Sequence, residues 1–175
     1  DNYILSKGGI VMKKVVIIAL AMVMAFAMAS CGGDSAKVYG GFYSANIPDS
    51  FTVNEYESEF VRDSEAYPGY EDKIKVEILT GNAEDEIAGS LEYWGDSHQQ
   101  LDDVTYGDIT WKVETFTWNS DAPSCTFYTD IDDSNYLEVN FFMMGADSEE
   151  VVSIMESFTI QDGAYEKHQE FLGGL

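Results

Sequence analysis

The chain has 175 residues, of which 32 are acidic and 9 are lysine or arginine, so its formal net charge at neutral pH is −23. A surface with this excess of carboxylates repels the phosphates of nucleic acids and of anionic lipids. This excludes nucleic acid as a partner and leaves cations and basic surfaces as the groups that the protein attracts. The length suits one domain with a core of ordinary size.

Residues 12–30 have the pattern of an export signal, in which two lysines precede an apolar run and small residues precede Cys31. The apolar run, residues 15–29, is about 15 residues long and so falls short of the roughly 20 that a membrane-spanning helix prefers. An uncleaved membrane anchor, or a secretory signal that leaves Cys31 as a free thiol, are the alternatives. Because Met12 is a natural start, residues 1–11 are interpreted as upstream or added residues and are left out of the fold prediction.

The four residues Met28-Ala29-Ser30-Cys31 resemble the lipobox of bacterial lipoproteins, with methionine where leucine is usual. The resemblance implies that a diacylglycerol is attached to the Cys31 thiol and that the mature protein begins there, with residues 31–37 as a tether. It also implies a location at the outer face of the cytoplasmic membrane, which we assign to a Gram-positive bacterium. If Cys31 is acylated, Cys125 has no partner for an intramolecular disulfide.

The domain itself is expected over residues 38–160 and is predicted to start with a hairpin. Residues 38–43 and 51–56 have strand character on either side of a proline-containing turn. Residues 62–72 are then expected to form a loop. Residues 73–78 alternate apolar and charged side chains, which predicts a half-buried strand.

A helix is predicted over residues 83–94, because Asn82 is a good cap and three acidic residues follow it, where the helix dipole favours them. One face of this helix is apolar and is expected to pack on the sheet; it contains Ala83, Ile87, Leu91 and Trp94. Trp94 and Trp111 are both expected to fill the core between this helix and the sheet.

Three strong strand patterns follow, over residues 109–117, 125–131 and 137–143, and turn-forming residues join the last two as an antiparallel hairpin. The first of the three is predicted to be central, with Trp111 pointing into the core beneath the helix of residues 83–94. A second helix is predicted from a capping-box-like start at Asp147 and Glu150. Residues 161–175 are predicted to be a polar tail, with a loosely docked short helix as one option.

Two segments resemble the PsbP-like fold. Residues 43–51, YSANIPDSF, are similar to its opening strand and turn, and residues 147–158 are similar to its closing helix and Ser-Phe step. The resemblance implies an α+β domain in which two or three helices flank an antiparallel β-sheet, and a binding or assembly module without catalytic activity. The fold includes a photosystem subunit, a nuclear-import cofactor and bacterial lipoproteins, so no site residue is carried over.

Asp130 begins a segment that starts like a calcium-binding loop. Its sixth position is Asn135 instead of glycine and its twelfth is Phe141 instead of glutamate, so it is not an EF-hand. A solvated hairpin turn is favoured. A weak calcium site that uses Asp130, Asp132 and Asp133 is the alternative.

Residue types that carry catalysis do not form a recognisable motif in this chain. His98 and His168 lie far apart in the sequence and are expected to be exposed and without function. Cys125 shares a strand face with apolar residues, so a buried structural thiol is favoured over a nucleophile. There is no Gly-x-Ser-x-Gly elbow and no phosphate-binding glycine loop, so we do not expect an enzyme.

Aromatic side chains are the remaining candidates for binding, because flat rings with polar edges stack on sugars and peptides. Six rings are candidates for such a platform: Tyr93, Trp94, Tyr106, Trp111, Trp118 and Tyr128. Trp118 and Tyr128 are the predicted binding residues, and Trp118 is expected to be exposed. The sequence therefore favours a lipid-anchored, non-catalytic module for an envelope protein, peptide or glycan. A calcium-linked envelope or stress protein is the alternative.

Overall fold

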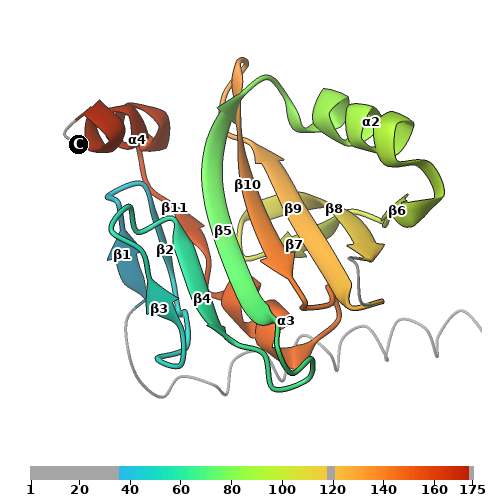
Figure 1. Ribbon diagram of the computed structural model, residues 1–175. Coiled ribbons are helices and arrows are strands. Elements are labelled where there is room, and N and C mark those ends of the chain that lie inside the picture. The colour runs from blue at the N-terminus through green and yellow to red at the C-terminus, as the bar shows by residue number, and fades with distance from the viewer. Residues whose placement is uncertain (1–35, 118–120, 174–175) are drawn as a thin grey trace, which may run out of the picture. The chain divides into compact units, whose positions relative to one another are not determined.

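Two antiparallel sheets and three α-helices form an α+β fold in the part of the chain that the computed structural model describes, residues 36–117 and 121–173 (Figure 1). The predicted α+β class is therefore confirmed. Cys31, with the rest of the predicted signal, and Trp118 lie outside the described residues. No helix within the described ranges is long and apolar enough to cross a membrane.

The smaller sheet joins the two ends of the domain. Its strands are β1 (Lys37–Tyr39), β2 (Tyr43–Ala45) and β11 (Thr159–Ile160), in the order β1-β2-β11. The turn between β1 and β2 contains Gly40 and Gly41, both with positive φ (53° and 76°), a conformation that glycine adopts without steric cost. A tight hairpin therefore forms at this glycine pair, before the chain reaches the proline turn.

This early turn makes the predicted first hairpin, between residues 38–43 and 51–56, wrong. The strand after the proline turn, β3 (Thr52–Val53), pairs instead with β4 (Glu59–Asp63). Part of β4 falls inside the stretch predicted as a loop, residues 62–72. These residues form a strand because β4 pairs along its whole length with residues 71–75 of the long strand that follows.

The larger sheet has the strand order β3-β4-β5-β10-β9-β8-β6, and β7 also pairs with β8. Its remaining strands are β5 (Glu71–Thr80), β6 (His98–Gln100), β7 (Val104–Tyr106), β8 (Ile109–Thr117), β9 (Pro123–Asp130) and β10 (Asn135–Phe142). The predicted hairpin of β9 and β10 is confirmed, with Tyr136 opposite Asp130. The central strand is β10 and not β8 as predicted, because β10 pairs with β5 on its other side.

The main core lies between one face of the larger sheet, the smaller sheet and α3 (Glu149–Glu156). Ser148 caps α3 by accepting a hydrogen bond from the backbone N–H of Val151 at 3.3 Å, one residue later than the predicted start at Asp147. The sheet side of this core is apolar: Phe60, Ile74, Val76, Trp111, Val113, Cys125, Phe127, Leu137, Val139 and Phe141. Its helix side contains Val151, Ile154, Met155 and Phe158.

Helix α2 (Ala83–Trp94) covers the opposite face of the sheet (Figure 1). Asn82 caps it as predicted, accepting a hydrogen bond from the Asp85 N–H at 2.9 Å. Ala83 and Ile87 are buried against Tyr128 and Tyr136, in a cluster separate from the main core.

The predicted packing of the two tryptophans beneath α2 is wrong in both cases. Trp111 is fully buried, but it belongs to the main core, where its ring meets Phe158 edge to face at 5.5 Å. The two-residue period of a strand puts Lys112, not Trp111, on the α2 side, where its Nζ lies 2.7 Å from Glu84. Trp94 is 53% exposed, because it comes at the last turn of α2, past the edge of the cluster.

The predicted domain ends with β11, and the tail after it, residues 161–175, contains a third helix, α4 (Ala164–Gly173). Ala164 and His168 are its buried residues, and the His168 ring meets Phe42 at 4.8 Å. The prediction that His168 is exposed is therefore wrong, because α4 docks through this side chain. Burial lowers the pKa of His168.

Candidate functional site

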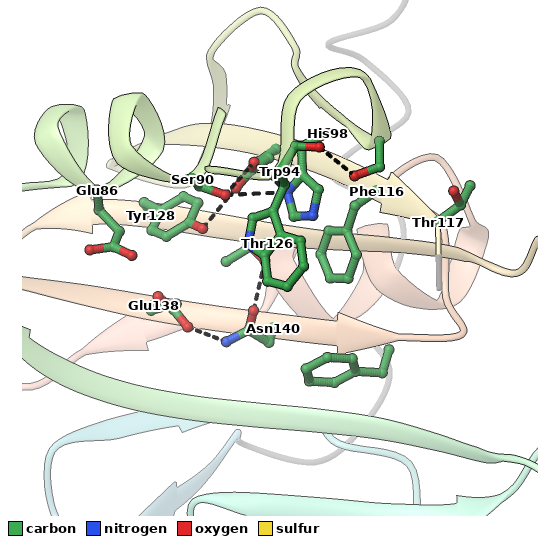
Figure 2. A pocket seen from close by; sticks show the side chains of 13 residues that line it. Glu86, Ser90, Trp94, His98, Phe116, Thr117, Thr126, Tyr128, Glu138 and Asn140 are labelled. Atoms are coloured by element: carbon green, nitrogen blue, oxygen red, sulfur yellow. Dashed lines mark hydrogen bonds and ion pairs between the residues drawn. The ribbon is translucent and has the colours of Figure 1, made fainter. Parts of the chain in front are cut away.

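A pocket of about 540 Å³ opens between the C-terminal half of α2 and the sheet, and we refer to it as the α2 pocket (Figure 2). Its walls come from α2, the short 3₁₀ turn Gly95–Ser97, and strands β6, β8, β9 and β10. The residues that line it are Glu86, Ser90, Trp94, Ser97, His98, Glu114, Phe116, Thr117, Thr126, Tyr128, Glu138, Asn140 and Phe142. Aromatic rings and carboxylates thus share one cavity.

The deepest polar group of the α2 pocket is Glu114, which is 1% exposed. The Ser90 hydroxyl donates to Glu114 Oε1 at 2.7 Å, and the Tyr128 hydroxyl donates to Oε2 at 3.0 Å. His98 Nδ1 lies 2.6 Å from Oε1. A carboxylate that receives three hydrogen bonds is held in one orientation, because any rotation leaves buried donors without partners.

This geometry also fixes which ring nitrogen of His98 faces Glu114. A carboxylate oxygen is an acceptor, so a contact of 2.6 Å requires that the proton is on Nδ1. The other ring nitrogen, Nε2, has no hydrogen-bond partner among the described residues, so it is left for a ligand.

The His98 ring is stacked between two other rings (Figure 2). Trp94 is nearly parallel to it, with centroids 5.6 Å apart, and Phe116 is nearly parallel at 4.8 Å. The predicted exposure of His98 is wrong, since only 13% of its side chain is accessible. The cause is β6, which pairs with β8 so that His98 lies opposite Phe116.

Glu138 and Asn140 of β10 form the other polar part of the α2 pocket. The Thr126 hydroxyl donates to Asn140 Oδ1 at 2.7 Å, and the Asn140 amide donates to Glu138 Oε1. Burial raises the pKa of Glu138, and the like charges of Glu77 and Glu86 raise it further, against the lowering effect of the Asn140 hydrogen bond. The ionised form of Glu138 is thus less well stabilised than a carboxylate in water.

Ser90, His98 and Glu114 are the residue types of a hydrolase triad, but their arrangement differs. In such a triad the serine bonds to His Nε2 and the acid to Nδ1. Here the Ser90 hydroxyl donates to Glu114 and lies 3.2 Å from Nδ1, on the same side as the acid. His98 is therefore not placed to take a proton from Ser90 through Nε2.

Cys125 does not reach this site. It is fully buried in the main core, its Sγ donates to the Met144 carbonyl at 3.4 Å, and burial raises the pKa of the thiol strongly. The prediction of a buried structural thiol is confirmed.

Of the two predicted binding residues, Tyr128 lies in the α2 pocket and Trp118 is outside the described residues. Tyr128 is only 4% exposed, and its hydroxyl donates to Glu114, so it holds that carboxylate in place and is not free to bind a ligand through its hydroxyl. Trp94, assigned to the core from the sequence, is at the pocket mouth instead. Its neighbour Tyr93 is 78% exposed and does not line the pocket.

Two of the three aspartates of the predicted calcium site, Asp130 and Asp132, have separate structural roles. Asp130 accepts a hydrogen bond from the Ala83 N–H at 2.7 Å, at the start of α2. Asp132 accepts from Asn135 and from the Ser134 N–H, and these bonds lower its pKa. Asp133 is exposed. Within the described ranges no three His, Cys, Asp or Glu side chains are grouped to hold a metal ion. The calcium hypothesis stays a prediction, which calorimetry with calcium would test.

Glu114, Glu138 and Asn140 are the site residues that the sequence analysis missed. They occupy the alternate positions of β8 and β10, which a two-residue period assigns to the side away from the core. The available signal was that aromatic residues, Phe116 and Phe142, occur in the same phase as these polar residues. A strand face that only met water would have little reason to contain such rings.

No family model and no curated protein matches the chain. A crystal structure of a protein from Bacteroides thetaiotaomicron VPI-5482 is similar, with 18% sequence identity and a TM-score of 0.41. The match covers 73% of this chain and 49% of the other, so the chain spans about half the length of that protein.

Proposed function

We propose that this chain is a lipid-anchored, extracytoplasmic binding protein, whose domain has a PsbP-like fold and binds a small ligand in the α2 pocket without chemical change. The observation that carries the proposal is the combination of exposed and buried groups in that pocket. Trp94 forms an accessible aromatic wall, while Glu114 and its three donors form a rigid interior. Pockets with apolar walls and a few fixed polar groups are typical of small-molecule sites.

Binding is favoured over catalysis by the way the polar groups are used. The hydroxyls of Ser90 and Tyr128 both donate to Glu114, and Cys125 is remote and buried. Both protons face the same carboxylate, Glu114, which is 1% exposed and also holds His98, so the two hydroxyls are committed to this buried network. A ligand from the cell envelope, such as a glycan fragment or a peptide, is the source that fits the proposed location.

The anchoring part of the proposal rests on the lipobox-like residues that end at Cys31. Cys31→Ala removes the sulfur to which a diacylglycerol would be attached. We expect this variant to appear in the medium or to remain as an uncleaved precursor, whereas the parent protein stays in the membrane fraction. An unmodified Cys31 in membrane-extracted parent protein, measured by mass spectrometry, would contradict the proposal.

The binding part is tested by recovering small molecules from the protein. The parent chain, Trp94→Ala and Tyr93→Ala would be incubated with a dialysable extract of the host envelope, washed and examined by mass spectrometry. Tyr93 is the matched control, because it is an exposed aromatic residue of the same helix that does not line the pocket. We expect a compound that the parent and Tyr93→Ala retain and Trp94→Ala loses. Equal retention by all three proteins, or by none, would count against the α2 pocket.

A further inference from the structure

The hydrogen-bonding groups of the α2 pocket are unevenly used. Most of its donors are spent on acceptors of the protein itself: Ser90 and Tyr128 on Glu114, Ser97 on the Trp94 carbonyl, Thr126 on Asn140, and Asn140 on Glu138. The acceptors that remain are Glu138 Oε2 and the part of the Glu86 carboxylate that Tyr136 does not use. The pocket therefore has a surplus of acceptors, and a ligand that matches it must supply N–H or O–H donors.

The charges of the pocket favour a positively charged donor over a neutral one. Glu86, Glu114 and Glu138 line it, and none of the described residues that line it is lysine or arginine. Lys75, whose charge lowers the pKa of Glu138, is itself paired with Glu77 at 2.6 Å. Glu138 is thus a half-buried carboxylate that forms no ion pair with any lysine or arginine in the part of the chain that the structure describes. A cationic ligand gains a charge-assisted hydrogen bond there, which is about twice as strong as a neutral one.

The aromatic walls indicate that the cation is organic. Trp94 and Phe116 flank His98, and Phe142 meets Phe116 edge to face at 6.1 Å. Such rings attract ammonium groups through their π faces and bury the carbon atoms that carry the charge. A bare metal ion would need several oxygen or nitrogen ligands around one point, and the described residues contain no such group.

We infer that the α2 pocket is specific for a protonated organic amine, with the ammonium group at Glu138 and the carbon skeleton against Trp94 and Phe116. The inference rests on the proposed binding function and adds the chemical class of the ligand. The ligand chemistry is that of an amino sugar, a polyamine or a lysine side chain, and the experiment below tests this shared chemistry.

Benzylamine is a suitable probe, because benzyl alcohol is its neutral counterpart of nearly equal shape and benzoate is its anionic counterpart. Each would be titrated into the protein by calorimetry at neutral pH. We expect benzylamine to bind at least about tenfold more tightly than benzyl alcohol, and benzoate not to bind. Glu138→Gln should weaken benzylamine by about tenfold, because it removes the charge but keeps the acceptor for Asn140.

The control variant is Glu65→Gln, an equal loss of charge at an exposed residue of the β4–β5 loop that does not line the pocket. It should leave the affinity unchanged. Equal weakening by Glu138→Gln and Glu65→Gln would show non-specific attraction to an acidic protein and would overturn the inference. Benzyl alcohol binding as tightly as benzylamine, or no binding of benzylamine, would also overturn it. The extract experiment separates the two proposals. If the parent protein still retained a compound that Trp94→Ala loses, while benzylamine did not bind, the assignment of the ligand as an amine would be wrong and the proposed binding function would stand.

Discussion

The two faces of the larger sheet are formed by the same strands but differ in the polarity of their buried side chains. On the α3 side, alternate residues of β8, β9 and β10 are apolar and closely packed, as with Trp111, Phe127 and Phe141. On the α2 side, the intervening positions hold Glu114 and Asn140, buried but polar. The first face is what hydrophobic burial produces by default. The second needs a reason, because burying a carboxylate costs free energy even when it is fully hydrogen bonded.

The difference fits the proposed function: the α3 face is packed as a core, whereas the α2 face leaves a pocket lined by polar groups. The small apolar cluster under α2 contains Ala83, Ile87, Tyr128 and Tyr136 and ends before Trp94. Beyond it, the space that a core would fill is left as a pocket. Polar groups buried at the expense of packing are expected at functional sites. Substitutions on the two faces should therefore act on different properties.

The largest expected effect on stability is that of Trp111→Ala. Trp111 is fully buried against Phe127 and Phe158, and its indole N–H has no hydrogen-bond partner among the described residues, so its contribution is packing. The cavity should cost about 3–5 kcal/mol, a large share of the roughly 5–15 kcal/mol of a typical domain. Trp94→Ala should cost under about 1 kcal/mol. Denaturant unfolding measures both, and equal losses would remove the distinction between the faces.

Glu114→Gln should have the next largest effect. Glutamine presents an NH₂ group where the carboxylate accepted hydrogen bonds, so one of the donors Ser90, His98 or Tyr128 loses its partner. A buried donor left without a partner costs about 1–3 kcal/mol. The exposed substitution Glu65→Gln should change the free energy of unfolding by less than about 0.5 kcal/mol. A similar small value for Glu114→Gln would show that its network is not held as the distances imply.

A smaller, pH-dependent effect is expected at His168. Burial lowers its pKa in the folded protein, whereas the unfolded chain titrates near 6.5. As the pH falls below about 6.5, the unfolded state takes up a proton that the folded state resists, so folding is destabilised. His168→Leu should remove this dependence. The free-energy difference between variant and parent should grow between pH 7 and pH 5 by at most about 1.4 kcal/mol per pH unit. A difference that is flat with pH would contradict a buried neutral histidine.

Local patterns in the sequence predicted those parts of the fold that depend on neighbouring residues. Asn82 caps α2, residues 73–78 lie within β5, and β9 pairs with β10 as expected. Errors arose where distant segments compete for the same partner. β10 is central because its second edge pairs with β5, and no local sequence pattern predicts which distant strand pairs with that edge.

The candidate site was predictable only in part, for the same reason. Tyr128 was selected as an aromatic residue with a polar edge, and it does line the pocket. The pairing of His98 with Glu114 depends on β6 folding back onto β8, across 16 positions of the chain. A short, polar strand such as β6 has no pattern that distinguishes it from a loop. In the sequence, His98 and Glu114 therefore resemble ordinary surface residues.

The comparison of the two faces is tested most directly by the stability of Glu138→Gln at two pH values. Because burial and neighbouring carboxylates raise the pKa of Glu138 above its usual 4.5, its charge opposes folding at neutral pH and not at acidic pH. The account predicts that the variant is more stable than the parent at pH 7, by about 0.5–2 kcal/mol, and equally stable near pH 4, with Glu65→Gln unchanged at both. A variant that is less stable than the parent at pH 7 would show that Glu138 serves the fold, and would contradict a face kept polar for a ligand.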